Sequence, residues 1–197
     1  MESRIIVATK PQIITGLKRA DLPKLFADRG YHCGAEIGVA CGHFSEAFCQ
    51  AIPGLALLCV DPWEPYRGDT RGRSVASHDA CHLEAKTRLA PYSAALIRAM
   101  SLDAAKAVPV ASLDFVFIDG NHSYRHVKDD LMAWSSRVRS GGIVSGDDYY
   151  HFKYAGVVEA VNEFVAEQGI AEWFLTDDPT RRNYKGQVQP AYFWVQP

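Results

Sequence analysis

Asp119 directly follows the mostly apolar run 113–118, and His122 comes three residues later. Two further acids, Asp147 and Asp148, follow a strand-like stretch at 142–146. Carboxylates that converge on one small volume repel each other, so they either share protons or gather around a cation. Ligand sets made only of oxygen favour a hard ion such as Mg²⁺. Histidine titrates near neutral pH and can remove a proton from a hydroxyl group. These residues therefore predict a metal site at Asp119, Asp147 and Asp148, with His122 as a general base.

Apolar segments that alternate with helical segments indicate how these residues are positioned. The expected strands are residues 33–40, 55–61, 93–100, 113–119 and 142–148, and the expected helices are residues 43–52, 77–90, 102–108, 123–138 and 154–168. This alternation predicts a doubly wound α/β fold, with a mostly parallel sheet covered by helices on both faces. Residues 171–176 and 191–196 predict an antiparallel hairpin at the sheet edge, and residues 18–29 predict a leading helix.

The turn "EIGVACG", residues 36–42, joins the first of these strands to a helix. In open α/β sheets, ligands bind beyond the carboxyl ends of the strands. Gly38 and Gly42 would let a ligand approach the backbone, and Asp61, which ends the second strand, could accept hydrogen bonds from ribose hydroxyls. A GxGxxG fingerprint is absent, which leaves open a nucleoside without a pyrophosphate. Glu36 lies between apolar residues and therefore needs backbone donors or a ligand cation.

Ordinary structural roles are the alternatives for each of these motifs. The turn at 36–42 could be a plain strand-to-helix connection, and Asp61 could cap a turn before Pro62. The segment "DGNH" could be a polar turn with a solvated histidine. "GDD" alone would be ambiguous, because Gly and Asp are common turn formers. Their joint occurrence at neighbouring strand ends favours a site.

The bulk properties of the chain limit the classes of function. Its 197 residues, 48% hydrophobic and 22% charged, predict one domain, with a helical lead-in at 1–30, a cofactor and metal core at 34–150 and a closing helix and hairpin at 151–197. The formal charge of −2 gives no general attraction to nucleic acid, and no apolar run approaches the roughly 20 residues of a membrane span. Five cysteines without a Cys-x-x-Cys pair, and no signal peptide, predict a reducing, cytoplasmic compartment. The expected small core residues are Cys33, Cys41, Cys49 and Cys59.

The segments "EIGVACG", "VDPW", "FVFIDGNHSY" and "GGIVSGDDY" together resemble the motifs of class I S-adenosylmethionine-dependent methyltransferases, over about residues 34–150. "IDGNHSY" and "GDDY" are similar, more narrowly, to the metal-dependent sugar O-methyltransferases of the macrocin type. The resemblance implies a seven-stranded sheet, S-adenosylmethionine as cofactor, Mg²⁺ at the three aspartates and His122 as the base. The residues implied to contact the cofactor are Glu36, Gly38, Gly42, Asp61, Met100, Ser101 and Asp119. Ala40 departs from the pattern, because the family usually has glycine at this position.

The expected activity is therefore transfer of a methyl group from S-adenosylmethionine to a hydroxyl of a small molecule, a sugar or another diol. A metal-dependent hydroxylase-like or hydrolytic enzyme on the same fold stays open, as does a noncatalytic cofactor-binding module. No nucleic-acid or membrane partner is expected, and a homo-oligomer stays open. Zinc binding by His78 and His82 lacks a fourth-ligand pattern. The basic loops 67–73 and 181–185 could contact an anion, but solvated basic loops are at least as common.

Overall fold

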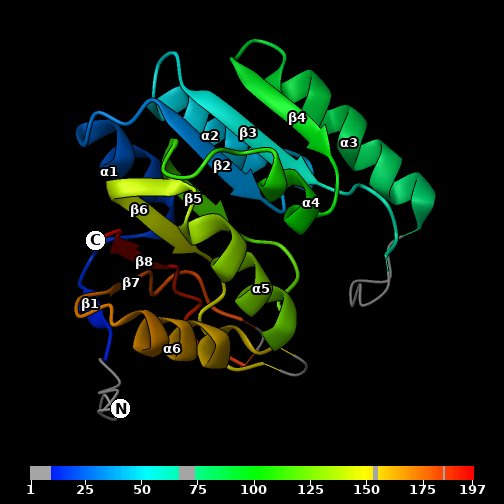
Figure 1. Cartoon of the computed structure of the whole chain (residues 1–197). Helices are drawn as coiled ribbons and strands as arrows, with labels where there is room; N and C mark the ends of the chain where they lie inside the picture. The colour runs from blue at the N-terminus through cyan, green and yellow to red at the C-terminus, as the bar shows by residue number, and fades with distance from the viewer. Residues whose placement is uncertain (1–9, 67–73, 153–154, 184) are drawn as a thin grey trace.

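The computed structural model describes residues 10–66, 74–152, 155–183 and 185–197. Its centre is an eight-stranded sheet in the order β1-β7-β8-β6-β5-β2-β3-β4 (Figure 1). All neighbouring strands run parallel except β8, which is antiparallel to both β6 and β7. The strands are β1 (Gln12–Ile14), β2 (Cys33–Ile37), β3 (Ala56–Asp61), β4 (Ala94–Arg98), β5 (Leu113–Ile118), β6 (Val138–Gly146), β7 (Phe174–Thr176) and β8 (Tyr192–Val195).

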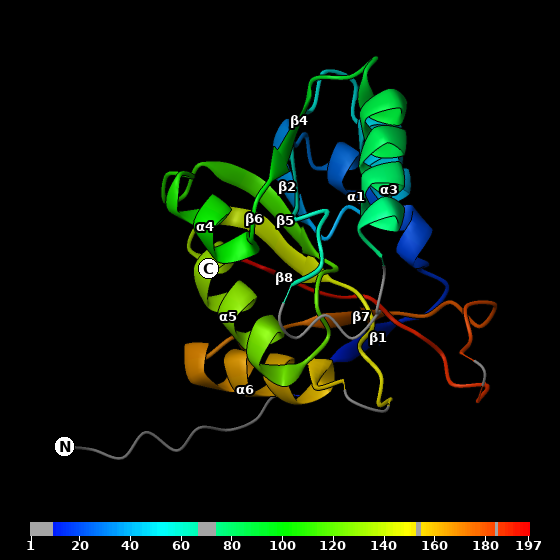
Figure 2. The same ribbon diagram turned by 90° about the vertical axis from the view of Figure 1, so that its right-hand side faces the viewer.

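Helices cover both faces of this sheet, as Figure 2 shows. They are the short 3₁₀ helix η1 (Arg19–Asp21) and the α-helices α1 (Leu22–Asp28), α2 (His43–Ala51), α3 (Val75–Leu89), α4 (Ser101–Lys106), α5 (Tyr124–Ser135) and α6 (Val157–Gln168). On one face α4, α5 and α6 bury residues such as Ala105 and Leu131, and on the other α1, α2 and α3 bury residues such as Phe26 and Phe48. The predicted doubly wound α/β fold is confirmed.

Strand β5 shows why the sheet needs both helical layers. Phe115 and Phe117 pack into the core beneath α1 and α2, whereas Val116 and Ile118 pack into the core beneath α4, α5 and α6. Side chains of a strand alternate between the two faces of its sheet, so the run 115–118, which is apolar at every position, must be covered on both sides. β5 is therefore held at the centre of the sheet, and its carboxyl end delivers Asp119 to a fixed place.

The sheet has eight strands where the family resemblance implies seven. The additional strand, β1, is only three residues long and pairs in parallel with β7 at the edge of the sheet. The sequence pattern of these three residues does not predict a strand, and β1 is a strand only because it pairs with β7. The predicted antiparallel pairing of the last two strands is confirmed, but β8 is inserted between β6 and β7. The edge position expected for this hairpin is taken by β1.

Backbone contacts lock the carboxyl ends of the central strands together. Gly38 donates its N–H to the carbonyl of Val60 at 2.8 Å, and Asp119 donates its N–H to the carbonyl of Ile37 at 2.7 Å. Gly38 has a φ of +91°, and a Cβ at this position would lie 2.1 Å from the carbonyl oxygen of Asp119. Only glycine fits so close an approach in a left-handed conformation. The turn after β2 and the turn after β5 are therefore packed directly on each other.

One cysteine prediction is wrong. Cys41, expected as a small core residue, forms a disulfide with Cys81 of α3, 40 residues further along the chain. The bond joins the turn after β2 to the helix beside it, a pairing that sequence spacing does not reveal. The prediction for Cys49 and Cys59 is confirmed, since both are buried free thiols, and Cys33 is a partly buried free thiol.

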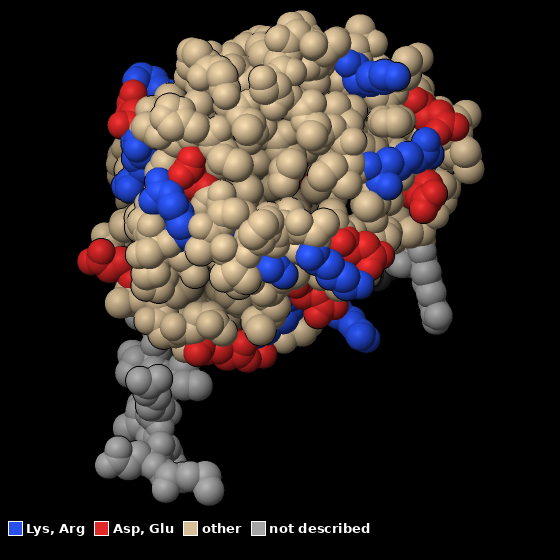
Figure 3. Space-filling view, turned by 45° about the horizontal axis from the view of Figure 1, so that its top comes forward, with Lys and Arg blue, Asp and Glu red and all other residues tan. Residues whose placement is uncertain are grey.

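The remaining surface is mixed in charge. Figure 3 shows acidic and basic side chains interspersed around a broad uncharged area, with no extended patch of one sign among the described residues of that face. The basic residues Arg67, Arg71 and Arg73 of the loop 67–73 lie outside the described residues. No helix in the described ranges is both long and apolar enough to cross a bilayer.

Candidate active site

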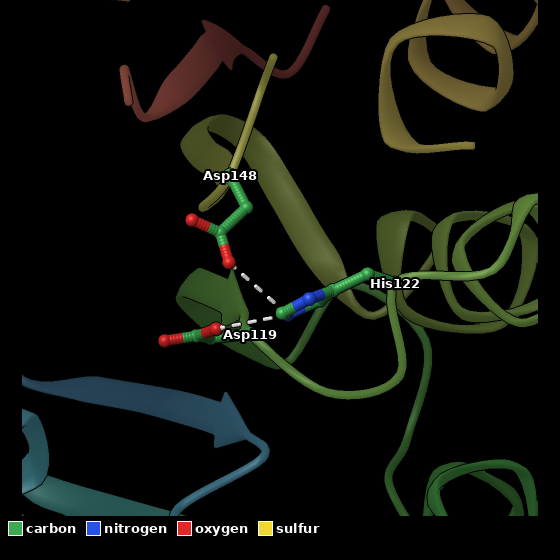
Figure 4. A group of neighbouring side chains, drawn as sticks. All are labelled: Asp119, His122 and Asp148. Carbon is green, nitrogen blue, oxygen red and sulfur yellow. Dashed lines mark ion pairs between the residues drawn. The ribbon is translucent and has the colours of Figure 1, made fainter. Parts of the chain in front are cut away.

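Three of the predicted site residues converge beyond the ends of β5 and β6 (Figure 4). The Nε2 atom of His122 lies 3.5 Å from Oδ1 of Asp119 and 3.3 Å from Oδ2 of Asp148. One ligand atom from each of these side chains lies within 4.8 Å of the others. Asp119 directly follows β5, and Asp148 is turned toward the histidine by a left-handed φ of 58°. The group of two carboxylates and one imidazole suits a divalent cation in its donor types and spacing.

Asp147 points elsewhere and contacts two arginines. Its side chain is only 1% exposed, and its two oxygens accept hydrogen bonds from Nη1 and Nη2 of Arg181 at 2.6 and 2.7 Å. The Nε atom of Arg19 lies 2.6 Å from Oδ2 of the same carboxylate. The role of Asp147 as a third metal ligand stays a prediction, but both of its oxygens already face guanidinium groups. Asp147 ties two segments outside the central core to the end of β6.

Arg19 is the functional candidate that the sequence pattern missed. Besides Asp147, it contacts Asp119, whose Oδ2 lies 3.0 Å from Nη2 of Arg19. Its guanidinium carbon lies 3.7 Å from the ring centre of Phe44 in α2. In the sequence, Arg19 belongs to a segment read as a leading helix, and no motif distinguishes it from the other arginines of the chain. Arg181 belonged to a basic loop considered for anion binding, and the anion that it binds is Asp147.

Burial changes the acidity of this cluster. Burial first, and then the charge of Asp147, raises the pKa of Asp148 to about 6. Burial also raises the pKa of Asp147, as does Asp119, while Arg19 and Arg181 act in the opposite direction. His122 packs edge-on against the ring of Phe152, with 5.7 Å between the ring centres. The imidazole therefore contacts both acidic groups and an aromatic ring.

A cavity of about 380 Å³ adjoins this cluster and is lined by most of the residues predicted to contact the cofactor. These are Gly38, Asp61, Met100, Ser101 and Asp119. A second cavity of about 390 Å³ shares Gly38 and Asp119 with the first, and its lining also includes Glu36 and Arg19. The two cavities therefore meet where the turns after β2 and β5 touch. Gly42 is absent from the lining of both cavities and instead lies at the N-cap of α2, with a left-handed φ of 81°.

Asp61 organises the turn after β2. Its Oδ2 accepts a hydrogen bond from the N–H of Ala40 at 3.0 Å, and its Oδ1 accepts one from the N–H of Trp63 at 2.8 Å. The indole of Trp63 in turn donates to the carbonyl of Ala40 at 2.7 Å. A carboxylate has about four acceptor sites, so Asp61 keeps acceptor capacity for a ligand hydroxyl. The predicted turn role and the predicted ligand role of Asp61 are therefore compatible.

Glu36 has a different partner from those expected. Its side chain is buried and accepts a hydrogen bond from the hydroxyl of Ser45 in α2. Burial is the main cause that raises the pKa of Glu36 to about 8. The partner is thus a side-chain hydroxyl rather than backbone donors, and the carboxyl group is largely protonated at neutral pH. A neutral carboxyl group can remain buried with a single hydrogen bond, whereas an ionised one could not.

The lining of the first cavity contains an acid that the sequence reading did not single out. Asp130 of α5 lines this cavity, and burial raises its pKa to about 7. Ser101, predicted to lie near an adenine, accepts a hydrogen bond from the indole of Trp134 at 2.8 Å. Asp130 follows the helical periodicity of a core-facing stripe, which could have marked it as a buried polar residue.

A family model described as "Methyltransferase domain" matches residues 35–149, which is more than half of the chain. The chain belongs to this family. The match begins inside β2 and ends just after the paired acids, so it includes the turn after β2 and the cluster of Asp119, His122 and Asp148. It leaves out Arg19 and Arg181, which enter this methyltransferase site from the flanking segments.

Solved structures support the same fold for this methyltransferase. The O-methyltransferase TomG from Streptomyces achromogenes, involved in tomaymycin synthesis and solved with SAM, has a TM-score of 0.64 and 18% identity, covering 91% of this chain and 80% of TomG. An O-methyltransferase from Bacillus cereus, solved with SAH, also has a TM-score of 0.64, with 14% identity and coverage of 90% of this chain and 80% of that one. The resemblance to class I S-adenosylmethionine-dependent methyltransferases is therefore confirmed at the level of the fold.

One curated protein matches a shorter part of the chain. Uncharacterized protein R132 of Acanthamoeba polyphaga mimivirus is 38% identical over 56 residues, which is 28% of this chain. The match spans 25% of the length of R132, so it carries no information about the activity of either whole protein.

Proposed function

We propose that the protein is an S-adenosylmethionine-dependent O-methyltransferase that methylates a hydroxyl group of a small molecule, a sugar or another diol. The observation that carries this proposal is the position of His122. Its Nε2 atom faces the carboxylates of Asp119 and Asp148 at the mouth of a cavity built on the turn after β2. A methyltransferase fold supplies the cofactor site, and a histidine beside it supplies a base for the acceptor.

The cofactor residues have separable roles in this proposal. Gly38 lets the ligand reach the backbone where the two cavities meet, since any side chain there would fill the space against Asp119. Asp61 accepts hydrogen bonds from the ribose hydroxyls with the oxygen sites that Ala40 and Trp63 leave free. Bound in this way, S-adenosylmethionine supplies a methyl group on a positively charged sulfur. The protein's contribution is to align that methyl group with the acceptor oxygen.

His122 takes the proton from the acceptor hydroxyl at its Nε2 atom. The carboxylates of Asp119 and Asp148 stabilise the positive charge that the ring then carries, since both lie within about 3.5 Å of that nitrogen. The ring of Phe152 excludes water from one side of the imidazole. Proton removal and methyl transfer to the same oxygen then leave a neutral ether.

The two carboxylates that face His122 would also hold a divalent cation. Mg²⁺ is commonly bound by one or two protein carboxylates with its other positions open, and Asp119 and Asp148 provide that number. When bound, such an ion makes a hydroxyl that contacts it more acidic. This arrangement leaves the imidazole free to act as the base. A cation that also took Nε2 of His122 as a ligand would remove that base, so the two roles can be distinguished by mutation.

Release of S-adenosylhomocysteine from S-adenosylmethionine, measured with a panel of sugars and aromatic diols, tests the proposal. His122→Ala should lower turnover by roughly 10²-fold or more, the usual scale for losing a general base, and leave cofactor affinity measured by calorimetry nearly unchanged. His32→Ala is the matched control, because His32 is exposed at the opposite end of β2.

Each failure of this test has a distinct meaning. Cofactor binding without turnover on any acceptor would favour a noncatalytic binding module. Product formation without S-adenosylhomocysteine would favour a hydroxylase-like or hydrolytic enzyme. Turnover of the His122→Ala variant equal to that of the wild type would remove His122 from the proposed role.

A further inference from the structure

We propose that Arg19 sets the affinity of the site for its divalent cation, by acting as a built-in positive charge that shares Asp119 with the ion. This inference rests on the proposed function and concerns the same cluster. Asp119 presents its two oxygens to different partners: Oδ1 lies 3.5 Å from His122, and Oδ2 lies 3.0 Å from Nη2 of Arg19. One carboxylate therefore faces the cation position and the guanidinium at the same time.

Charge counting shows how much Arg19 matters. The cluster contains three carboxylates, from Asp119, Asp147 and Asp148, and two guanidinium groups, from Arg19 and Arg181. Two of the three negative charges are therefore already balanced by the protein. A positive charge a few ångströms from a divalent ion opposes its binding even when the two do not touch. Removing Arg19 would leave the site with a larger net negative charge.

Arg19 is held in place by packing as well as by charge. Its guanidinium lies over the ring of Phe44. Three residues further along the chain, Leu22 is fully buried at the start of α1. Upstream, the carbonyl of Leu17 accepts a hydrogen bond from the N–H of Asp177 at 2.7 Å. The arginine is thus fixed between two anchored points, and its charge acts as a constant part of the site.

The two arginines have different consequences when they are removed. Arg181 donates two hydrogen bonds to the buried carboxylate of Asp147, so its loss would remove both bonds and leave the carboxylate, among the described residues, only its contact with Arg19. If Arg19 is removed instead, Asp147 keeps both bonds to Arg181. Arg19 can therefore be replaced with less damage to the fold, which makes it the informative position. Arg19→Met retains an apolar stem over Phe44 without the charge, and Arg19→Lys retains the charge without the planar fork.

Titration of the full-length protein with Mn²⁺, followed by the electron paramagnetic resonance signal of the free ion, measures the effect without any turnover. Arg19→Met should lower the dissociation constant for Mn²⁺ tenfold or more at low ionic strength, which is the scale of a unit charge acting on a divalent ion through water. Arg19→Lys should lie between Arg19→Met and the wild type. Lys24→Met removes an exposed positive charge that pairs with Asp28 and should change the constant less than twofold. Asp148→Asn should weaken binding in every background.

The wild-type protein offers an independent test that needs no variant. Coupling between two sites is reciprocal, so a cation that is opposed by Arg19 must also weaken the contact of Arg19 with Asp119. Amide hydrogen exchange in residues 12–21 should therefore become faster when Mn²⁺ is added, while exchange in α6 stays the same. Unchanged exchange in residues 12–21 at saturating Mn²⁺ would overturn the inference.

The outcomes separate this inference from the proposed function. If the wild type and Arg19→Met bind Mn²⁺ equally well, Arg19 does not set the affinity, and the methyltransferase proposal is unaffected. If neither protein binds Mn²⁺, the inference and the cation part of the proposed function both fail. Release of S-adenosylhomocysteine in the presence of a chelator would then show that methyl transfer itself stands.

Discussion

Replacing Glu36 by glutamine should change how the stability of the protein depends on pH. The carboxyl group is 2% exposed and bonded to Ser45, and its pKa is raised from 4.5 to about 8, first by burial. At a pH between 4.5 and about 8, Glu36 is ionised in the unfolded chain and protonated in the folded protein. The unfolded state then binds fewer protons, so the free energy of unfolding falls as the pH rises.

The size of this effect follows from the same two values. Each pH unit over which Glu36 is ionised only in the unfolded state lowers the free energy of unfolding by ~1.4 kcal/mol. A pKa of about 8 in the folded protein therefore corresponds to a decrease of at most roughly 5 kcal/mol between pH 4.5 and pH 8. Glutamine keeps an oxygen that can accept the hydrogen bond from Ser45 and never ionises. The Glu36→Gln variant should therefore match the wild type near pH 5 and exceed it by up to several kcal/mol near pH 8.

Urea unfolding followed by tryptophan fluorescence at pH 5, 6, 7 and 8 measures this difference. Subtracting the curve of the wild type from that of the variant removes the contributions of Asp130 and Asp148, which titrate in the same range in both proteins. Glu172→Gln, at an exposed position, controls for the loss of one acidic residue. A constant difference between Glu36→Gln and the wild type across this pH range would refute the argument that Glu36 is protonated in the folded state.

Two further predictions concern the turn after β2. Ala40 has a left-handed φ of 48°, which costs a residue with a Cβ ~1–2 kcal/mol. Ala40→Gly should therefore raise the free energy of unfolding by up to ~1 kcal/mol, after the greater flexibility of glycine in the unfolded chain is deducted. The control Ala133→Gly, within α5, should lower the free energy of unfolding. A lower free energy of unfolding for both variants would contradict backbone strain at Ala40. Reducing the Cys41–Cys81 bond, which closes a loop of 40 residues, should destabilise the protein by ~2–5 kcal/mol. Thiol titration of the unfolded protein should find three groups before reduction and five after it, and five before reduction would exclude the bond.

The order of strands and helices could be read from the sequence because it depends on local patterns. The run from Phe115 to Ile118 is apolar at every position, and only a strand covered on both faces can bury such a run. Asp119 and His122 could be assigned to a site for a related reason. Parallel strands bring their carboxyl ends to one edge, so polar residues that follow them meet there. Strand β1 was missed because its three residues form a strand only through pairing with β7.

The sequence alone therefore determined the fold class, the edge of the sheet that contains the site and three of the residues that gather there, Asp119, His122 and Asp148. The tertiary structure decided which charges face each other. It turned Asp148 toward His122, turned Asp147 toward Arg181, and brought Arg19 to Asp119 from 100 residues away in the chain. It also joined Cys41 to Cys81. Patterns of hydrophobicity are local, so they can be recognised in the sequence alone. An ion pair or a disulfide depends on distances of a few ångströms between segments that only the folded chain brings together.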